Sequence, residues 1–222
     1  MKIVGLNIDK GRLAVSVVQR QFGKSELVDS FIQSFANDAE LAEVLREKSS
    51  SWAGAKVVSS IPGNLFSQRT LTLPFADRKR VEKALPFEVE DLVPFDLGDI
   101  VIDHLVLGST AAGKESEKQV LCMMLPKEIL RRHLDLLAGA GIDPQAVVPS
   151  YAGLFSIANM MPAESGALLL CGSDACLKSP IALKALRSFS GSHPTGGLRH
   201  VLQALGTEHR EPVEKAALLI DD

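Results

Sequence analysis

The segment from Gly108 to Lys114 has the spacing of a phosphate-binding loop, because two glycines enclose four residues and a lysine follows the second. Such a loop also needs a serine or threonine next, to hold magnesium, and a helix that begins at the phosphates. Here the next residue is Glu115, whose carboxylate would repel phosphate, and the following residues have the pattern of a strand. We therefore interpret this segment as a solvated hairpin loop.

The first turn of the chain is a second candidate, with Asn7, Asp9 and Gly11 in close succession. In actin-like and sugar-kinase-like ATPases, a turn at this place carries an aspartate that holds the water shell of the metal, and a glycine two residues later. In this chain Asn7 stands in place of the aspartate and Asp9 in place of the glycine. The neutral amide gives magnesium no anionic partner, and Asp9 would repel phosphate. The alternative is that Asp9 serves as a displaced ligand.

A third candidate lies in the second part of the chain, where the sequence from Leu170 to Asp174 would form the equivalent turn. The glycine of the motif is kept as Gly172, but Leu170 replaces the acid. Two altered turns in corresponding places predict a fold that has kept its shape and lost its nucleotide chemistry. We therefore expect no bound cofactor at Asn7, Asp9 or Gly172.

Other reactive residues have no catalytic or metal-binding spacing. The five histidines are scattered, and no nucleophile stands at a motif distance from any of them. The three cysteines lie in apolar stretches without a Cys-x-x-Cys pattern, which is typical of reduced core residues. They are Cys122, Cys171 and Cys176. We therefore predict no catalytic residue and no metal site.

The composition is that of an ordinary globular protein, with 222 residues, 46% hydrophobic residues and a formal net charge of −3. This length predicts one large domain or two subdomains. The near-neutral charge gives no electrostatic reason to expect nucleic-acid binding. The chain opens without a secretory signal and contains no continuous apolar stretch of about 18 residues, so we expect a soluble intracellular chain.

Alternating apolar residues and turn signals predict a β-β-β-α-β-β order in the first third, beginning with an antiparallel meander. The expected strands are Lys2 to Ile8, Arg12 to Arg20, about Glu26 to Phe35, Lys56 to Ser60 and Phe66 to Leu73. In the third strand, Leu27, Phe31 and Ile32 are the candidates for the core. Asn37 or Asp38 should cap the helix, which would bury Leu41, Val44 and Leu45.

A second helix should follow Asp77, with one apolar face. That face comprises Val81, Leu85, Val89 and Leu92. Pro86 predicts either a kink or a helix start nearer Leu85. Beyond it we expect strands at 100–107 and 118–125, helices at 127–138 and 151–160, an extended piece at 144–148, and a further unit from Gly166 with a short helix near 198–205. That last unit has only about 55 residues and would be an incomplete lobe.

The order of motifs resembles an actin-like family that contains PilM-type pilus assembly proteins and the cytoplasmic part of type II secretion protein L (GspL). Leu85-Pro86-Phe87-x-x-Glu90-Asp91 resembles the secretion branch, and Val93-Pro94-Phe95-Asp96 resembles the pilus branch. The opening hairpin, Ile61-Pro62-Gly63 and Leu125-Pro126-Lys127-Glu128 also stand where that family would have them. The resemblance covers residues 1–170 well and the remainder loosely.

The resemblance implies an α/β, actin-like (RNase H-like) fold. Its first lobe would span 1–165 with an inserted subdomain at about 77–145, and a partial second lobe would span 166–222. In the pilus branch, a groove takes the N-terminal peptide of a PilN-type membrane protein. In the secretion branch, the domain holds the secretion ATPase (GspE-like) against the inner membrane. Asn7 and Leu170 favour the secretion branch, because an ATP-binding pilus protein keeps acidic residues in its phosphate turns.

The resulting prediction is a non-enzymatic cytoplasmic scaffold that links the secretion ATPase to the inner-membrane platform of a type II secretion system. It would be tethered through a region beyond this chain or through a partner, and a homodimer is possible. The alternative is a PilM-like pilus protein that binds a PilN-type peptide, possibly with nucleotide. We predict a partner-binding segment at Leu92, Val93, Pro94 and Phe95. The same residues could instead fill the core of the inserted subdomain.

Overall fold

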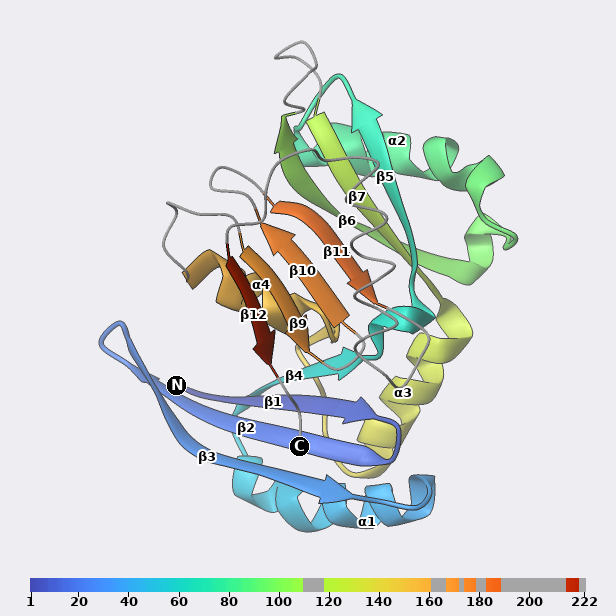
Figure 1. The fold of residues 1–222 in the computed structure, drawn as a ribbon. Helices are drawn as coiled ribbons and strands as arrows, with labels where there is room; N and C mark the ends of the chain where they lie inside the picture. Colours follow the sequence, from blue (N-terminus) through green and yellow to red (C-terminus); the bar gives the residue numbers. More distant parts are fainter. Residues whose placement is uncertain (110–117, 161–166, 172–173, 179–182, 189–214, 220–222) are drawn as a thin grey trace. The chain divides into compact units, whose positions relative to one another are not determined.

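The computed structural model describes residues 1–109, 118–160, 167–171, 174–178, 183–188 and 215–219 (Figure 1). The chain packs as two compact units. The first contains Met1–Pro62 and Lys127–Ser150, and the second contains Gly63–Pro126 and Tyr151–Asp222. The predicted lobes 1–165 and 166–222, and the insertion at 77–145, stay a prediction about how the family's fold is divided.

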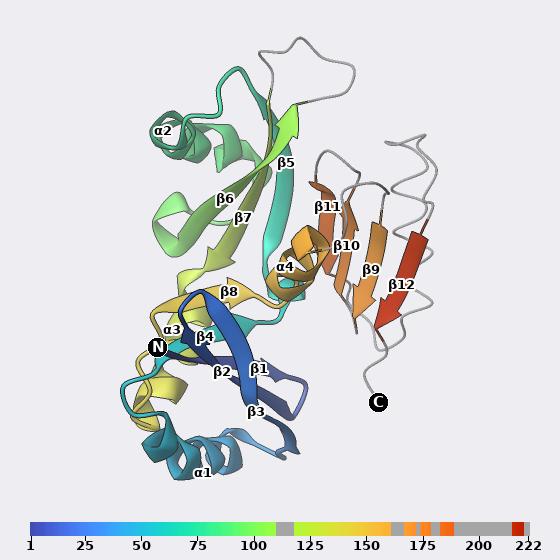
Figure 2. The same cartoon turned by 90° about the vertical axis from the view of Figure 1, so that its left-hand side faces the viewer.

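The first unit is built on a five-stranded sheet with the order β3-β2-β1-β4-β8, whose strands are all labelled in Figure 2. The first three strands form the predicted antiparallel meander, and β4 and β8 join it in parallel. The strands are β1 (Lys2–Asp9), β2 (Arg12–Gln21), β3 (Lys24–Ser34), β4 (Lys56–Ile61) and β8 (Ala146–Pro149). The helices of this unit are α1 (Asp38–Ser49) and α3 (Lys127–Gly139), and a 3-10 turn, Ser50–Trp52, follows α1.

Both hairpin turns of the meander use left-handed backbone. Lys10 and Gly11 have φ angles of 45° and 76°, and Phe22 and Gly23 have 49° and 80°. Two successive positive φ angles give the tight turn that matches the twist of antiparallel strands. Gly11 suits this turn because glycine adopts positive φ without a steric penalty.

The core of the first unit lies between the meander and its helices. Side chains alternate along β1 and β2, so one face of the sheet carries the buried residues. These residues are Val4, Leu6, Leu13, Val15 and Val17. They pack with Leu41, Val44 and Leu45 of α1 and with Leu137 of α3. Asn37 caps α1 by accepting hydrogen bonds from Ala39 N and Glu40 N, as predicted.

Two of the three core candidates in β3 are wrong. Phe31 packs against the core, but Leu27 and Ile32 are 59% and 55% exposed. Phe31 lies opposite the buried Val15, whereas Ile32 lies opposite Ala14 and therefore on the other face. The register also shifts at Val28, so Leu27 lies opposite Val18 instead of joining the buried row.

The second unit contains a three-stranded antiparallel sheet with the order β5-β7-β6 and a four-stranded sheet with the order β11-β10-β9-β12. The strands of the first are β5 (Ser67–Leu73), β6 (Ile100–Ser109) and β7 (Lys118–Pro126). The strands of the second are β9 (Ala167–Cys171), β10 (Asp174–Lys178), β11 (Leu183–Ser188) and β12 (Lys215–Leu219). The helices are α2 (Arg78–Val89) and α4 (Ala152–Met160), and Figure 2 shows α4 beside β9 and β10.

Helix α2 begins after Asp77, whose side chain accepts a hydrogen bond from Arg80 N, as predicted. Val81, Leu85 and Val89 are buried against the three-stranded sheet. The alternative start near Leu85 is wrong, because the helix runs from Arg78 with Pro86 inside it. The burial of Leu85 and Val89 on either side of Pro86 stabilises this last turn.

Leu92 does not share the buried face of α2. The helix ends at Val89, and Leu92 closes a 3-10 turn, Glu90–Leu92, in which it is 40% exposed. Val89 already departs from α-helical geometry, with φ −106° and ψ −10°, so the row of buried side chains along α2 ends there, three residues before Leu92. The prediction that Leu92 continues the apolar face is therefore wrong.

The three-stranded sheet is covered on both faces. Successive side chains of β7 point to opposite sides, so Val120, Cys122 and Met124 join the α2 core while Leu121 joins a second core. That second core comprises Leu107, Leu121, Tyr151, Leu154, Ala158 and Cys176. Cys122 and Cys176 are buried, reduced cysteines, which confirms the prediction for these two. The side chain of Cys171 and the expected helix at 198–205 lie outside the described residues.

Candidate functional site

The first turn is occupied by contacts of the protein itself. The Ser60 hydroxyl donates a hydrogen bond to Asn7 Oδ1 at 2.6 Å, because the parallel register places the two residues side by side on β1 and β4. Ser60 is buried, with 8% of its surface exposed. The amide oxygen that stands in place of a magnesium-binding carboxylate therefore holds two strands together.

Gly11 of the same turn has a structural role. A Cβ at this position would meet the carbonyl oxygen of Phe35 at 3.0 Å, and the backbone there has a positive φ. The N–H of Phe35 donates to the carbonyl of Gly11 at 2.7 Å. The glycine thus allows the end of β3 to approach the first turn.

The other two candidate turns are described only at their edges. Gly108 lies in β6, one residue before the strand ends at Ser109. Strand β7 begins at Lys118, so the expected strand after the loop is confirmed. Glu115 and Gly172 lie outside the described residues. Leu170 lies in β9, with its backbone opposite Ala175 of β10.

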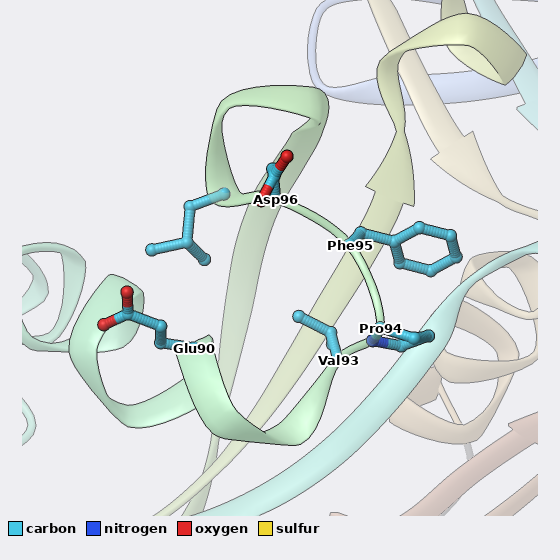
Figure 3. Close-up of a pocket in the computed structure, with 6 residues that line it drawn as sticks. Glu90, Val93, Pro94, Phe95 and Asp96 are labelled. Carbon is cyan, nitrogen blue, oxygen red and sulfur yellow. The ribbon is translucent and has the colours of Figure 1, made fainter.

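The predicted partner segment forms one wall of a pocket of about 410 Å³. Figure 3 shows Glu90 on one side and Pro94 on the other, with Val93 between them. The lining residues are Glu90, Val93, Pro94, Phe95, Asp96 and Leu97. The structure therefore brings three of the four predicted residues to one pocket.

The four predicted residues divide between the core and the surface. Val93 is half-buried and packs with Leu97 against the core of α2 and its sheet. Leu92 and Phe95 are 40% and 44% exposed, and Pro94 is also exposed. The core-filling alternative thus describes Val93, whereas partner binding by the segment stays a prediction.

The backbone of the segment bends at residues 93–95 and is held at both ends. Val93 has φ −128° and ψ 142°, and Asp96 has φ −65° and ψ 137°. At one end Arg69 Nη2 donates to the carbonyl of Leu92 at 3.3 Å. At the other end the N–H of Asp99 donates to the carbonyl of Asp96 at 2.9 Å. Two short 3-10 turns thus present four residues between them.

Sequence reasoning missed two residues that line this pocket and one exposed residue of α2. Glu90 and Asp96 line the pocket, and Phe87 on α2 is 79% exposed. The exposure of Phe87 had a readable signal, because it lies off the four-residue row of Val81, Leu85 and Val89. No pattern in the sequence indicated that Glu90 and Asp96 line the same pocket, because this depends on the course of the backbone between them.

Ser59 and His133 form a polar pair inside the first unit, with 2.7 Å between Ser59 Oγ and His133 Nε2. A serine next to a histidine could act as a nucleophile with its base. Ser59, however, is fully buried in β4, and no acid hydrogen-bonds to His133 among the described residues. Burial lowers the pKa of His133, which favours the neutral ring. The pair ties α3 to the sheet.

The described part of the chain has neither a membrane-spanning helix nor a group of metal ligands. None of its helices has both the length and the apolar character needed to cross a bilayer. Within the same residues, no three His, Cys, Asp or Glu side chains come together in a way that could hold a metal ion.

Solved structures with a similar course of the chain define the class of fold. A PilM–PilN type IV pilus biogenesis complex has a TM-score of 0.74 at 19% identity, with 98% of this chain and 81% of that chain covered. The cytoplasmic domain of EpsL, an inner-membrane component of the type II secretion system of Vibrio cholerae, has a TM-score of 0.61 at 16% identity, with 99% and 86% covered. A protein of unknown function with an actin-like ATPase fold, from Bacteroides thetaiotaomicron, has 0.55 at 12% identity, with 99% and 81% covered. The predicted actin-like α/β fold is confirmed.

The family follows from the sequence itself. The model of the family "Type II secretion system (T2SS), protein L" matches residues 25–156, which is more than half of the chain. The chain therefore belongs to the protein L family of the type II secretion system, as predicted. No curated protein matches it.

Proposed function

We propose that this chain is a non-enzymatic scaffold of the type II secretion system, which binds the secretion ATPase through the segment Leu92–Phe95 and holds it at the inner-membrane platform. The carrying observation is that Leu92 and Phe95 expose apolar side chains beside a pocket of about 410 Å³. Apolar side chains gathered at a surface are typical of protein-binding sites. The segment is held between two turns, which lowers the entropic cost of ordering it on binding.

The donor set of the first turn supports a role without catalysis. Asn7 offers a neutral oxygen that already accepts a hydrogen bond from Ser60. Magnesium prefers carboxylate ligands to a neutral amide oxygen. Ser59 is buried, so the Ser59–His133 pair supplies no reactive group at the surface. Asp9 is the remaining carboxylate of the turn.

The family supports a place at the membrane. Its members belong to the type II secretion system, and the similar EpsL structure is named as a cytoplasmic domain of an inner-membrane component. We place this chain on the cytoplasmic side, tethered through a further region or through a partner. Other inner-membrane platform proteins, or a second copy, are further candidates for contact.

A PilM-like function is the second candidate. The observation that favours it is the similarity to PilM in its complex with PilN. In this case the partner is a PilN-type N-terminal peptide, and Asp9 serves as a displaced ligand of the magnesium ion that accompanies a bound nucleotide. Measurable ATP binding that is lost in the Asp9→Asn variant would support it.

A capture experiment with matched variants tests the proposal. The immobilised chain is exposed to lysates that express either the N-terminal region of the secretion ATPase or a PilN-type N-terminal peptide. The Leu92→Ser/Phe95→Ser double variant should lose the ATPase region, whereas Leu27→Ser/Ile32→Ser should keep it. The control pair is also exposed, at 59% and 55%, but lies in the other unit. Capture of the peptide alone would favour the pilus function, and capture of neither would reject both.

A further inference from the structure

The stretch of sequence that contains the pocket is rich in acidic residues. From Ala84 to Ser109 the sequence contains six acidic residues and no lysine or arginine. The six are Glu88, Glu90, Asp91, Asp96, Asp99 and Asp103. All of them are exposed. The region therefore presents a negative potential to an approaching molecule.

Two of these carboxylates stand at the pocket itself without a cation. Glu90 and Asp96 both line it, and Figure 3 shows them around Val93. Among the residues that the structure describes, neither forms an ion pair. The guanidinium of Arg69 adds one positive charge at the Leu92 end of the segment, where it donates to the backbone carbonyls of Leu92 and Gln68. Glu90 and Asp96 therefore remain available to a cationic partner.

The site also has an apolar part, and Figure 3 shows Val93, Pro94 and Phe95 to one side of the two acids. Val93, Pro94, Phe95 and Leu97 supply apolar lining, and Phe87 on the adjoining helix is 79% exposed. A ligand that fits must therefore carry an apolar group as well as positive charge.

The backbone of the segment leaves one donor open. Val93 and Asp96 have extended φ and ψ angles, and residues 93–95 form a bend. In the described part of the chain, no hydrogen bond engages the N–H of Phe95. An extended segment of a partner can offer a backbone carbonyl to such a free N–H group.

We propose that the pocket binds an extended segment of a partner protein in which a large apolar side chain is flanked by lysines or arginines. This inference rests on the proposed function, since it names the kind of partner segment that the same site takes. The apolar side chain lies against Val93 and Leu97, and the flanking cations face Glu90 and Asp96. The same charges repel an anionic lipid surface.

The test uses two labelled decapeptides with the same Leu-Phe centre, flanked by four lysines in one and by four glutamates in the other. Fluorescence anisotropy with the full chain should show at least tenfold tighter binding of the lysine peptide. The Glu90→Gln/Asp96→Asn variant should bind it about fivefold more weakly and with less dependence on salt, as expected for exposed charge pairs. Glu40 and Glu43 on α1 provide the control, because Glu40→Gln/Glu43→Gln removes the same charge from the other unit and should leave binding unchanged.

Several outcomes overturn the inference. Equal binding of the two peptides, or full binding by Glu90→Gln/Asp96→Asn, contradicts the role of the acids. Capture by phosphatidylserine vesicles, or self-association of the chain, that is lost in Phe95→Ser would assign the pocket to lipid or to a second copy. Circular dichroism of each variant shows that it remains folded.

The same variants separate this inference from the proposed function. If the lysine peptide binds at the pocket and the secretion ATPase region is not captured, the proposed function fails and the inference stands. If the ATPase region is captured equally by the chain and by Glu90→Gln/Asp96→Asn, the inference fails and the function stands.

Discussion

Replacement of Phe22 by asparagine should stabilise the first unit, although the change removes a large apolar side chain. Phe22 and Gly23 form the two-residue turn between Gln21 and Lys24, and both have positive φ angles, of 49° and 80°. Left-handed backbone costs most L-residues about 1–2 kcal/mol, and asparagine pays less because its short polar side chain can hydrogen-bond locally. Phe22 is fully exposed, so no packing is lost.

The free energy of unfolding should rise by about 1 kcal/mol, because asparagine avoids most of the cost of left-handed backbone that phenylalanine incurs. The neighbouring position provides the opposite case. Nothing lies within 4 Å of a Cβ placed on Gly23, so Gly23→Ala changes only backbone strain. That variant should lose about 1 kcal/mol.

Urea unfolding followed by tryptophan fluorescence measures both variants. Trp52 is the single tryptophan, and it is buried in the core of the unit that contains the turn. The midpoint should rise for Phe22→Asn and fall for Gly23→Ala, with an unchanged dependence on urea. A lower midpoint for Phe22→Asn together with a neutral Gly23→Ala would refute the left-handed turn.

Burial lowers the pKa of His133, so the unfolded chain binds more protons than the folded one at mildly acidic pH. The free energy of unfolding should therefore fall as pH drops below about 6.5. His133→Leu should lose this dependence on pH, and an unaltered dependence would contradict the buried contact with Ser59. Burial raises the pKa of Cys122 to about 11, so iodoacetamide at pH 8 should modify this residue only after unfolding, as peptide mapping by mass spectrometry will show. Leu85→Ala should cost about 2–5 kcal/mol in urea unfolding, whereas Phe87→Ala should change stability by less than about 0.5 kcal/mol, and equal effects would argue against the packing of α2.

The elements of the fold could be predicted where local signals agree. Glycine turns and alternating apolar residues placed the three strands of the meander, and Asn37 and Asp77 marked the starts of α1 and α2. The failures arise where geometry changes without a change in residue type. The register shift at Val28 removed Leu27 from the buried row, and the end of α2 at Val89 left Leu92 outside the helix face.

The candidate site was predictable only in part, because its contacts join distant segments. The segment Leu92–Phe95 stood out by its motif, and its exposure followed from the turns on either side. The hydrogen bond from Ser60 to Asn7 needs the parallel register of β1 and β4, which no local pattern contains. Asn7 could therefore be predicted to have lost a magnesium ligand, but its structural role could not.

The most direct test of the scaffold function is isothermal titration of the ATPase N-terminal region into this chain, with and without ATP and magnesium. The scaffold function predicts the same affinity in both conditions, no heat from ATP alone, and loss of binding in the Leu92→Ser/Phe95→Ser variant. Binding that requires ATP, or that is unchanged in this variant, would contradict it.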